Sequence, residues 1–219
     1  MKIDKLLSGE FTTATSFGGS DQIWRWDTTV NKWAKYSYSK LTRQGAPAWR
    51  KFNYGTDESF SDLTDEDAVK PGETFMFFRA GDEPVTVTLS GQVRAFGSPT
   101  GYTVAKENYV FMAYPWPVEV KIADLPNLGN WETLTTATSF GGSDQVWRWD
   151  TTVNKWAKYS YSKLTRQGAP AWRKFNYATD ESFSDLTDAD KLLAGEGFLF
   201  FRAGDDPITI TWKSLESAE

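Results

Sequence analysis

The residues best suited to contact a ligand are aromatic, and they lie in two nearly identical stretches. Residues 21–40 read "DQIWRWDTTVNKWAKYSYSK" and residues 144–163 read "DQVWRWDTTVNKWAKYSYSK". Trp and Tyr combine a large apolar ring with one polar group, so they suit sugar-stacking surfaces and protein contacts as well as cores. These stretches, with the Trp that follows each, predict a ligand or contact surface made of Trp24, Trp26, Trp33, Tyr36, Tyr38, Trp49, Trp147, Trp149, Trp156, Tyr159, Tyr161 and Trp172.

Several catalytic chemistries are excluded by composition. The 219 residues include no His and no Cys, which removes thiol nucleophiles, His bases and the usual zinc ligands. A glycosidase-like carboxylate pair is the chemistry that remains, but no Asp or Glu stands in an apolar run that would raise its pKa. The glycines of "SFGGSD" lack the Lys-Ser/Thr of a phosphate-binding loop. We therefore expect no catalytic residue and a protein that is not an enzyme.

Charge and acidic clusters limit the possible partners and cofactors. The net charge is −5, whereas a nucleic-acid-binding domain is normally basic, so we expect no nucleic-acid partner. The acidic stretch "TDESFSDLTDED" (56–67) offers oxygen ligands, but it matches neither the EF-hand loop nor the glycine-rich nonapeptide repeat. We expect no metal site and no cofactor, with a structural calcium ion as the alternative.

Strands must position the aromatic residues. The runs "QIWRW" and "KWAKYSYS" flank "DTTVN", which predicts a hairpin. Alternation places Trp24 and Trp26 on one face of the first strand, and Tyr36 and Tyr38 on one face of the second. If these faces coincide, the four rings form a cross-strand ladder. A buried ladder is a core, and an exposed one is a platform for sugar rings or for another protein.

A long internal repeat organises the chain. Residues 12–64 match residues 135–187 at all but two positions, and the similarity continues more loosely beyond them. A different segment, 90–130, occurs once between the copies. We predict a first β-repeat domain at 1–89, a linker segment with strands at 90–130 that packs with one or both repeats, and a second β-repeat domain at 131–219.

The remaining pattern predicts an all-β fold: two tandem, nearly identical β-sandwich-like or barrel-like repeats joined by the β-rich linker. Turn residues recur about every 8–12 residues, as in sandwiches and barrels. "ETFMFFRA" and "PVTVTLSG" are expected to pair across the turn "GDE". Thr64 is expected to cap a short helical turn, and "YTVA" and "NYVFMAY" are expected strands of the linker. "KIDKLLSG" at the start resembles "KIADLPNLGN" at the end of the linker.

Four motifs, in this order, carry a family resemblance: "DQIWRWDTTVNKWAKYSY", "GETFMFFRAG", "LSGQV" and "NYVFMAYPWPVEVKIADL". The series resembles a repeat of secreted and surface proteins from Verrucomicrobia, Planctomycetes and related bacteria. Those repeats end in an "NPFPV…ADL" motif, from which "AYPWPVEVKIADL" departs. The resemblance implies an extracellular, repetitive β-module and carries over no catalytic residue.

These observations predict a non-enzymatic structural protein of the bacterial cell exterior: a surface-layer, fibre or filament subunit, or an adhesin module. It would assemble with itself or with neighbouring repeats through head-to-tail β contacts, with junctions near 4–9 and 207–213. The alternative is a carbohydrate-binding module or lectin with two equivalent Trp-lined sites on a polysaccharide. We expect an extracellular or cell-surface location, no membrane span, and no signal peptide within this chain.

Overall fold

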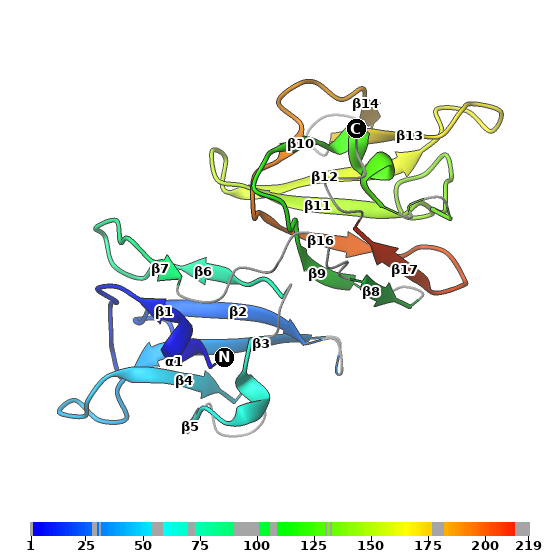
Figure 1. Cartoon of the computed structure of the whole chain (residues 1–219). Helices are drawn as coiled ribbons and strands as arrows, with labels where there is room; N and C mark the ends of the chain where they lie inside the picture. Colours follow the sequence, from blue (N-terminus) through cyan, green and yellow to red (C-terminus); the bar gives the residue numbers. More distant parts are fainter. Residues whose placement is uncertain are drawn as a thin grey trace. The chain divides into compact units, whose positions relative to one another are not determined.

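Antiparallel strands make up most of the regular structure, which confirms the predicted all-β class. The structure is a computed structural model, and it describes residues 2–27, 30, 32–53, 59–69, 73–89, 101–105, 109–129, 131, 133–176 and 182–212. The arrangement is β-sandwich-like, and the chain divides into two units, Met1–Arg94 and Ala95–Glu219 (Figure 1).

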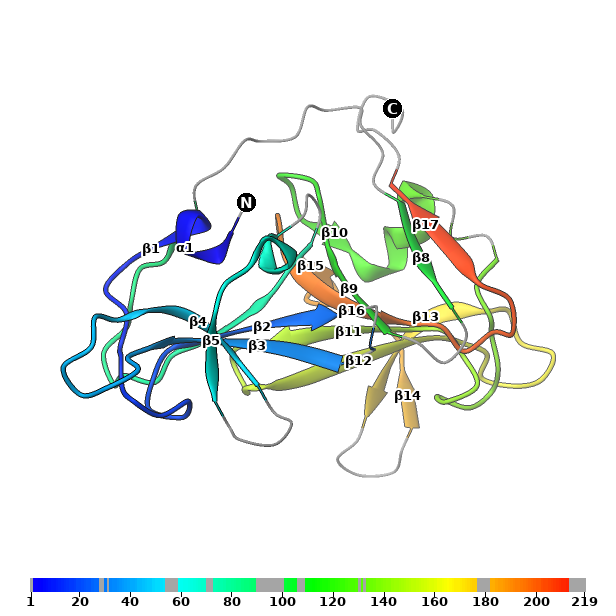
Figure 2. The same cartoon turned by 90° about the horizontal axis from the view of Figure 1, so that it is seen from below.

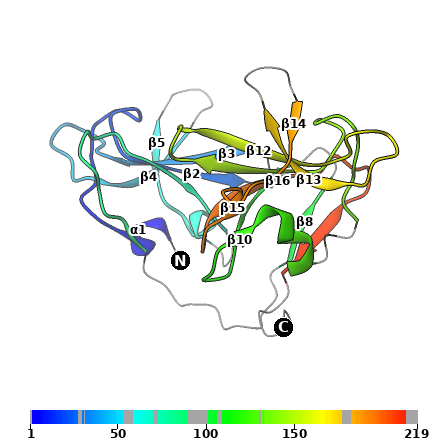
Figure 3. The same ribbon diagram turned by 90° about the horizontal axis from the view of Figure 1, so that it is seen from above.

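The first unit is built on a five-stranded antiparallel sheet in the order β5–β4–β3–β2–β6, and β1 pairs separately with β7. The helix α1 lies to one side of this sheet (Figure 3). The elements are α1 (Ile3–Leu6), β1 (Leu7–Ser8), β2 (Gln22–Asp27), β3 (Lys32–Ser39), β4 (Ala48–Phe52), β5 (Phe60–Asp62), the 3-10 turn η1 (Asp65–Asp67), β6 (Met76–Phe78) and β7 (Thr88–Leu89).

The second unit has a six-stranded sheet in the order β14–β13–β12–β11–β16–β9, and two smaller pairs, β8–β17 and β10–β15. The strands β8 and β17 run side by side in Figure 2. The elements are β8 (Gly101–Val104), β9 (Tyr109–Ala113), β10 (Val120–Lys121), the 3-10 helix η2 (Ile122–Leu128), β11 (Gln145–Asp150), β12 (Lys155–Ser162), β13 (Ala171–Asn176), β14 (Ser182–Ser184), β15 (Lys191–Leu192), β16 (Gly197–Phe201) and β17 (Ile208–Thr211).

The core of the second unit lies between the six-stranded sheet and the smaller elements. Val146 and Tyr159 from the large sheet join Ile210 of β17, Leu192 of β15 and Leu125 of η2 in one buried cluster. Each of these side chains is at most 1% exposed. Two layers that share one apolar interior are what defines a sandwich.

The hairpin predicted for each aromatic stretch is confirmed, but the aromatic faces of its two strands do not coincide, so the cross-strand ladder does not form. In the β2–β3 pair, Trp24 lies opposite Lys35 and Ile23 lies opposite Tyr36. Directly opposed residues share a face, so Trp24 and Tyr36 point to opposite sides of the sheet. The β11–β12 pair has the same register, with Trp147 opposite Lys158. The Trp residues of the first strand and the Tyr residues of the second therefore lie on different faces.

The expected pairing of "ETFMFFRA" with "PVTVTLSG" is also wrong. The strand β6 pairs with β2, whereas β7 pairs with β1. In the second unit β16 lies between β11 and β9, and β17 pairs with β8. The short turn suggested a hairpin, but pairing with strands distant in sequence takes precedence. The segments expected at junctions, 4–9 and 207–213, thus supply strands to their own units; residue 213 lies outside the described residues.

The described part of the segment between the copies belongs to the second unit. Its strands β8, β9 and β10 pair with β17, β16 and β15 respectively, and η2 lies on the same side of the six-stranded sheet as the β10–β15 pair (Figure 3). The expected strands "YTVA" and "NYVFMAY" correspond to β8 and β9. The expected helical turn is η1, where Thr64 forms a reciprocal cap with Asp67.

Candidate functional site

A row of aromatic side chains crosses the face of the first sheet that lies opposite the buried core. The rings of Trp26 and Trp33 meet edge to face with centroids 5.1 Å apart, and Trp24 lies 4.6 Å from Phe78. The Lys35 ammonium sits 3.5 Å from the centroid of the Trp24 ring, a cation–π distance. All five side chains are half-buried, so each keeps part of its surface available for contact.

Further rings continue this row across the sheet. Phe17 stacks on Phe52 with centroids 4.5 Å apart, and Phe52 contacts Phe60 on β5. The Trp24 indole N–H donates to Gln22 Oε1 at 2.9 Å, which fixes the orientation of its ring. We name the half-buried residues of this surface the outer aromatic face: Phe17, Trp24, Trp26, Trp33, Lys35, Phe52 and Phe78.

The second unit has a corresponding outer aromatic face: Phe140, Trp147, Trp149, Trp156, Lys158, Phe175 and Phe201. The Lys158 ammonium lies 3.5 Å from the Trp147 ring centroid, and burial lowers the pKa of Lys158. The β9 strand adds Tyr109, whose ring lies 5.4 Å from Trp147 and 4.8 Å from Phe201. Such a face can stack on flat apolar surfaces, including sugar rings.

The predicted contact residues divide between the two faces of each sheet. Trp24, Trp26 and Trp33 belong to the outer aromatic face, as do Trp147, Trp149 and Trp156. The other six point to the inner side, where Tyr36 and Tyr159 are at most 1% exposed and Trp49 and Trp172 are 5% exposed. Tyr38 and Tyr161 pack against the buried clusters. Alternation alone could not separate these groups, because the register between strands decides which faces coincide.

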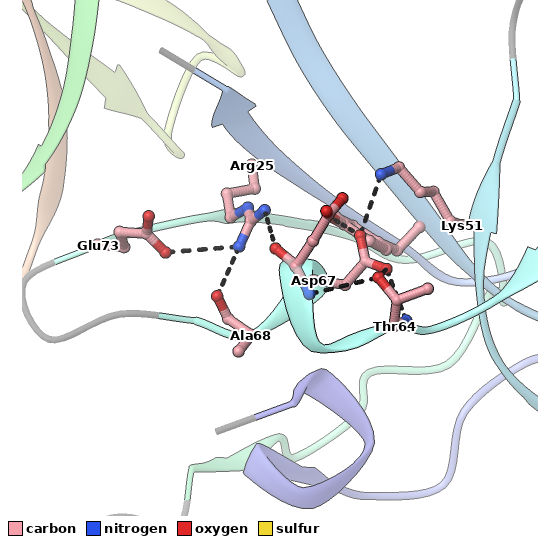
Figure 4. Close-up of polar contacts among 8 residues, drawn as sticks. Arg25, Lys51, Thr64, Asp67, Ala68 and Glu73 are labelled. Atoms are coloured by element: carbon pink, nitrogen blue, oxygen red, sulfur yellow. Dashed lines mark hydrogen bonds and ion pairs between the residues drawn. The ribbon is translucent and has the colours of Figure 1, made fainter. Parts of the chain in front are cut away.

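A buried carboxylate organises the inner face of the first unit (Figure 4). Asp67 Oδ1 accepts hydrogen bonds from the Tyr36 hydroxyl and the Lys51 ammonium, both at 3.1 Å. Its Oδ2 accepts from the Thr64 backbone N–H at 2.9 Å and from the Thr64 hydroxyl at 3.2 Å. Beside this carboxylate, Arg25 donates to the Ala68 carbonyl at 2.8 Å. The group therefore ties β3, β4 and η1 together.

The electrostatics of this network indicate a structural role. Burial by itself would raise the pKa of Asp67, but hydrogen bonds from Thr64 and Lys51 outweigh it and hold the pKa below its usual value. Burial also raises the pKa of Tyr36 well above its usual range, although Arg25 opposes the shift. A carboxylate that accepts four hydrogen bonds and has a low pKa is a weak general base. Asp190 repeats the arrangement in the second unit, with Tyr159, Lys174 and Thr187 as donors.

A second buried carboxylate, which the sequence patterns did not single out, joins distant parts of each unit. In the first unit, Asp21 Oδ2 accepts from the Thr12 backbone N–H at 2.9 Å and from Arg79 Nη1 at 2.6 Å, and its Oδ1 accepts from the Ala80 N–H at 2.7 Å. Asp21 is completely buried. We name this group the carboxylate clasp; its counterpart in the second unit is Asp144 with Thr135, Arg202 and Ala203.

The carboxylate clasp accounts for the repeated sequence "FFRAG". The Arg supplies the ion pair and the Ala supplies a backbone N–H. At the Gly position of the first copy, Gly81, a Cβ would come within 2.5 Å of Thr12 Oγ1 and 2.9 Å of Arg79 Nη2. The sequence does contain the residues of the clasp as a recurring pair of motifs, because "SD" and "RAG" occur together in both copies. Their contact spans 58 residues, however, and no local pattern indicates a contact at that separation.

The two large sheets differ at one edge. In the second unit β16 pairs with β11 on one side and with β9 on the other. Among the described residues of the first unit, its counterpart β6 pairs with β2 alone, and the sheet ends there. We name this boundary the β6 edge (Figure 1). The single-copy segment between the repeats thus supplies a strand that the described part of the first unit lacks.

Metal clusters and membrane-spanning helices are both absent from the described residues. No cluster of three or more Asp, Glu, His or Cys side chains suited to a metal ion occurs within them. The helices in the same part of the chain are too short or too polar to cross a membrane.

No protein-family model, curated protein or solved structure matches the chain.

Proposed function

We propose that this chain is a non-enzymatic structural protein of the bacterial cell exterior, made of two tandem β-sandwich-like repeats. It serves as a subunit of a surface layer, fibre or filament, or as an adhesin module, and its repeats join others head to tail through β contacts. The observation that carries the proposal is the β6 edge, which ends where its counterpart β16 continues to β9. Unprotected sheet edges add strands from other chains.

Other features agree with this role. The buried polar groups, the Asp67 network and the carboxylate clasp, are hydrogen-bonded within the fold and hold strands together. The resemblance of the motifs to repeats of secreted and surface proteins supports a location outside the cell. A repeated unit whose ends match favours open, head-to-tail arrays.

Size-exclusion chromatography with light scattering, followed by negative-stain electron microscopy, tests the proposal over a concentration series. We expect oligomers whose size grows with concentration. The matched control inserts a copy of residues 101–120 directly before Lys2, which supplies the first unit with its own strand. We call this the strand-complemented variant, and we expect it to remain monomeric. A chain that is a uniform monomer at every concentration contradicts self-assembly.

Carbohydrate binding is the second candidate function. The supporting observation is the outer aromatic face, where Trp24 and Trp33 are half-buried and Lys35 stacks on Trp24. Two such faces on one chain would gain avidity on a polysaccharide.

Quenching of Trp fluorescence by neutral and acidic soluble polysaccharides tests this candidate. We expect the double variant Trp24→Ala/Trp147→Ala to lose the response, because both residues belong to the outer aromatic faces. The control Trp49→Phe/Trp172→Phe changes inner-face residues and should keep it. Unchanged emission across the panel contradicts carbohydrate binding.

A further inference from the structure

Four hydrophobic positions of the first unit are less buried than their counterparts in the second unit. The first-unit residues are all half-buried: Val69, Phe75, Phe77 and Val87. Their counterparts, 123 positions later in the sequence, are all 0% exposed: Leu192, Phe198, Phe200 and Ile210. The same positions of the same fold therefore bury their side chains completely only where the segment that contains β8 and β9 is present.

The segment from β9 to β10 fills this region of the second unit. Val110 lies opposite Phe200 and Met112 lies opposite Phe198, so both point toward the core, and they are 7% and 0% exposed. Tyr114 follows, and its backbone N–H donates to the Glu196 carbonyl at 2.9 Å. The segment thus contributes both ladder hydrogen bonds and apolar side chains.

The aromatic residues after β9 extend the core. The Tyr114 ring lies 5.6 Å from Trp212, edge to face, and burial raises the pKa of Tyr114 to about 12. Trp116 is 7% exposed. The prolines on either side of Trp116 favour an extended backbone, which suits a segment that runs along a sheet edge.

The first unit retains the place where such a segment would end. In the second unit Lys121 pairs with Lys191, and the following Ile122 is 0% exposed. In the first unit Lys2 forms the equivalent bridge to Ala68, and Ile3 is 1% exposed. The residues at the end of this segment are therefore paired and buried in the same way in both units.

We propose that the β6 edge is an acceptor site for an extended segment of a second polypeptide with the side-chain pattern of residues 109–116. This pattern places aliphatic or thioether side chains inward, places aromatic side chains outward, and ends in Tyr-Pro-Trp. The segment adds antiparallel to β6 by backbone hydrogen bonds and covers Phe75 and Phe77. Within one chain β9 is paired with β16, so a second copy of this chain donates the segment by exchanging β9 from its own sheet to the β6 edge of its neighbour. The inference deepens the proposed function, because it names the partner of the head-to-tail contact.

A synthetic peptide of residues 107–120, "ENYVFMAYPWPVEV", tests the acceptor site on the full chain. Calorimetry should show one peptide bound per chain, and hydrogen exchange should show new protection at residues 75–78. A control peptide with Val110→Lys and Met112→Lys should bind on the order of a hundredfold more weakly, since each ammonium would be buried without a partner. The strand-complemented variant should not bind the peptide and should unfold at a higher temperature than the parent chain.

Each alternative outcome overturns the acceptor site: no binding, equal binding of the Lys peptide, protection elsewhere in the chain, or undiminished binding by the strand-complemented variant. This test is separate from the test of self-assembly. A chain that binds the peptide but stays monomeric keeps the acceptor site and loses self-assembly. A chain that forms oligomers yet ignores the peptide keeps the structural role and loses this acceptor.

Discussion

Replacing the carboxylate of one clasp tests the reasoning about the fold most directly. Asp144 is 0% exposed, and the Arg202 side chain that it pairs with is 6% exposed. In the variant Asp144→Asn the shape is kept, but the guanidinium loses its counter-charge while it stays buried. Removing one partner of a buried pair costs about 3–5 kcal/mol. We expect a loss of this size in the free energy of unfolding of the second unit.

A matched control has the same change of charge at the surface. Asp188 is ion-paired with Lys121, and the two side chains are 91% and 55% exposed, so water screens their attraction and its loss should cost little. Urea unfolding followed by circular dichroism would compare Asp144→Asn with Asp188→Asn. Equal losses in the two variants would refute the clasp argument. Asp21→Asn should cost less than Asp144→Asn, because the Arg79 side chain is 25% exposed and water can solvate part of its charge.

Three further predictions use similar comparisons. Phe200→Ala should lower the free energy of unfolding by about 3–5 kcal/mol, because Phe200 is fully buried. Phe77→Ala should lower it by about half as much in urea unfolding, and equal losses would contradict the difference in burial. Gly204→Ala should cost about 1–3 kcal/mol in thermal unfolding, since a Cβ would clash with the Arg202 guanidinium, while Gly141→Ala has no neighbour within 4 Å and should be nearly neutral. Burial alone would raise the pKa of Asp190, but hydrogen bonds from Thr187 and Lys174 hold this pKa below its usual value. The ionised Asp190 therefore stabilises the fold above about pH 4, and this stabilisation is lost as the pH falls further. Asp190→Asn should flatten the acid part of the curve of unfolding free energy against pH, and an unchanged acid slope would contradict the assignment.

Local patterns predicted the strands well and predicted their partners poorly. The hairpin of β2 and β3 and the cap at Thr64 depend on neighbouring residues, so the sequence indicates them directly. Alternation also defined the two faces of each strand. It could not define the register, and a shift of one residue exchanges the faces. For this reason Trp24 was grouped with Tyr36, although the sheet places them on opposite sides.

Contacts between distant segments explain the other errors. The turn after β6 suggested a hairpin with β7, but β7 pairs with β1, near the other end of the unit. Local patterns could not predict the carboxylate clasp for the same reason, since Asp21 and Arg79 are far apart in sequence. The Trp residues of the outer aromatic face were among the candidates, whereas Lys35 and Phe52 join it through the register of β3 and β4 and Phe17 joins it by stacking on Phe52.

The position of β9 along the chain has a consequence for biosynthesis. Domains generally fold in the order in which they leave the ribosome, so the first unit folds while β9 is emerging and before β16 exists. β9 lies closer in sequence to β6 than to β16, and closing the shorter loop costs less entropy. The acceptor site proposed above is therefore available to the nascent β9 before β16 is made, and completing the second unit would then require transfer of the strand to β16.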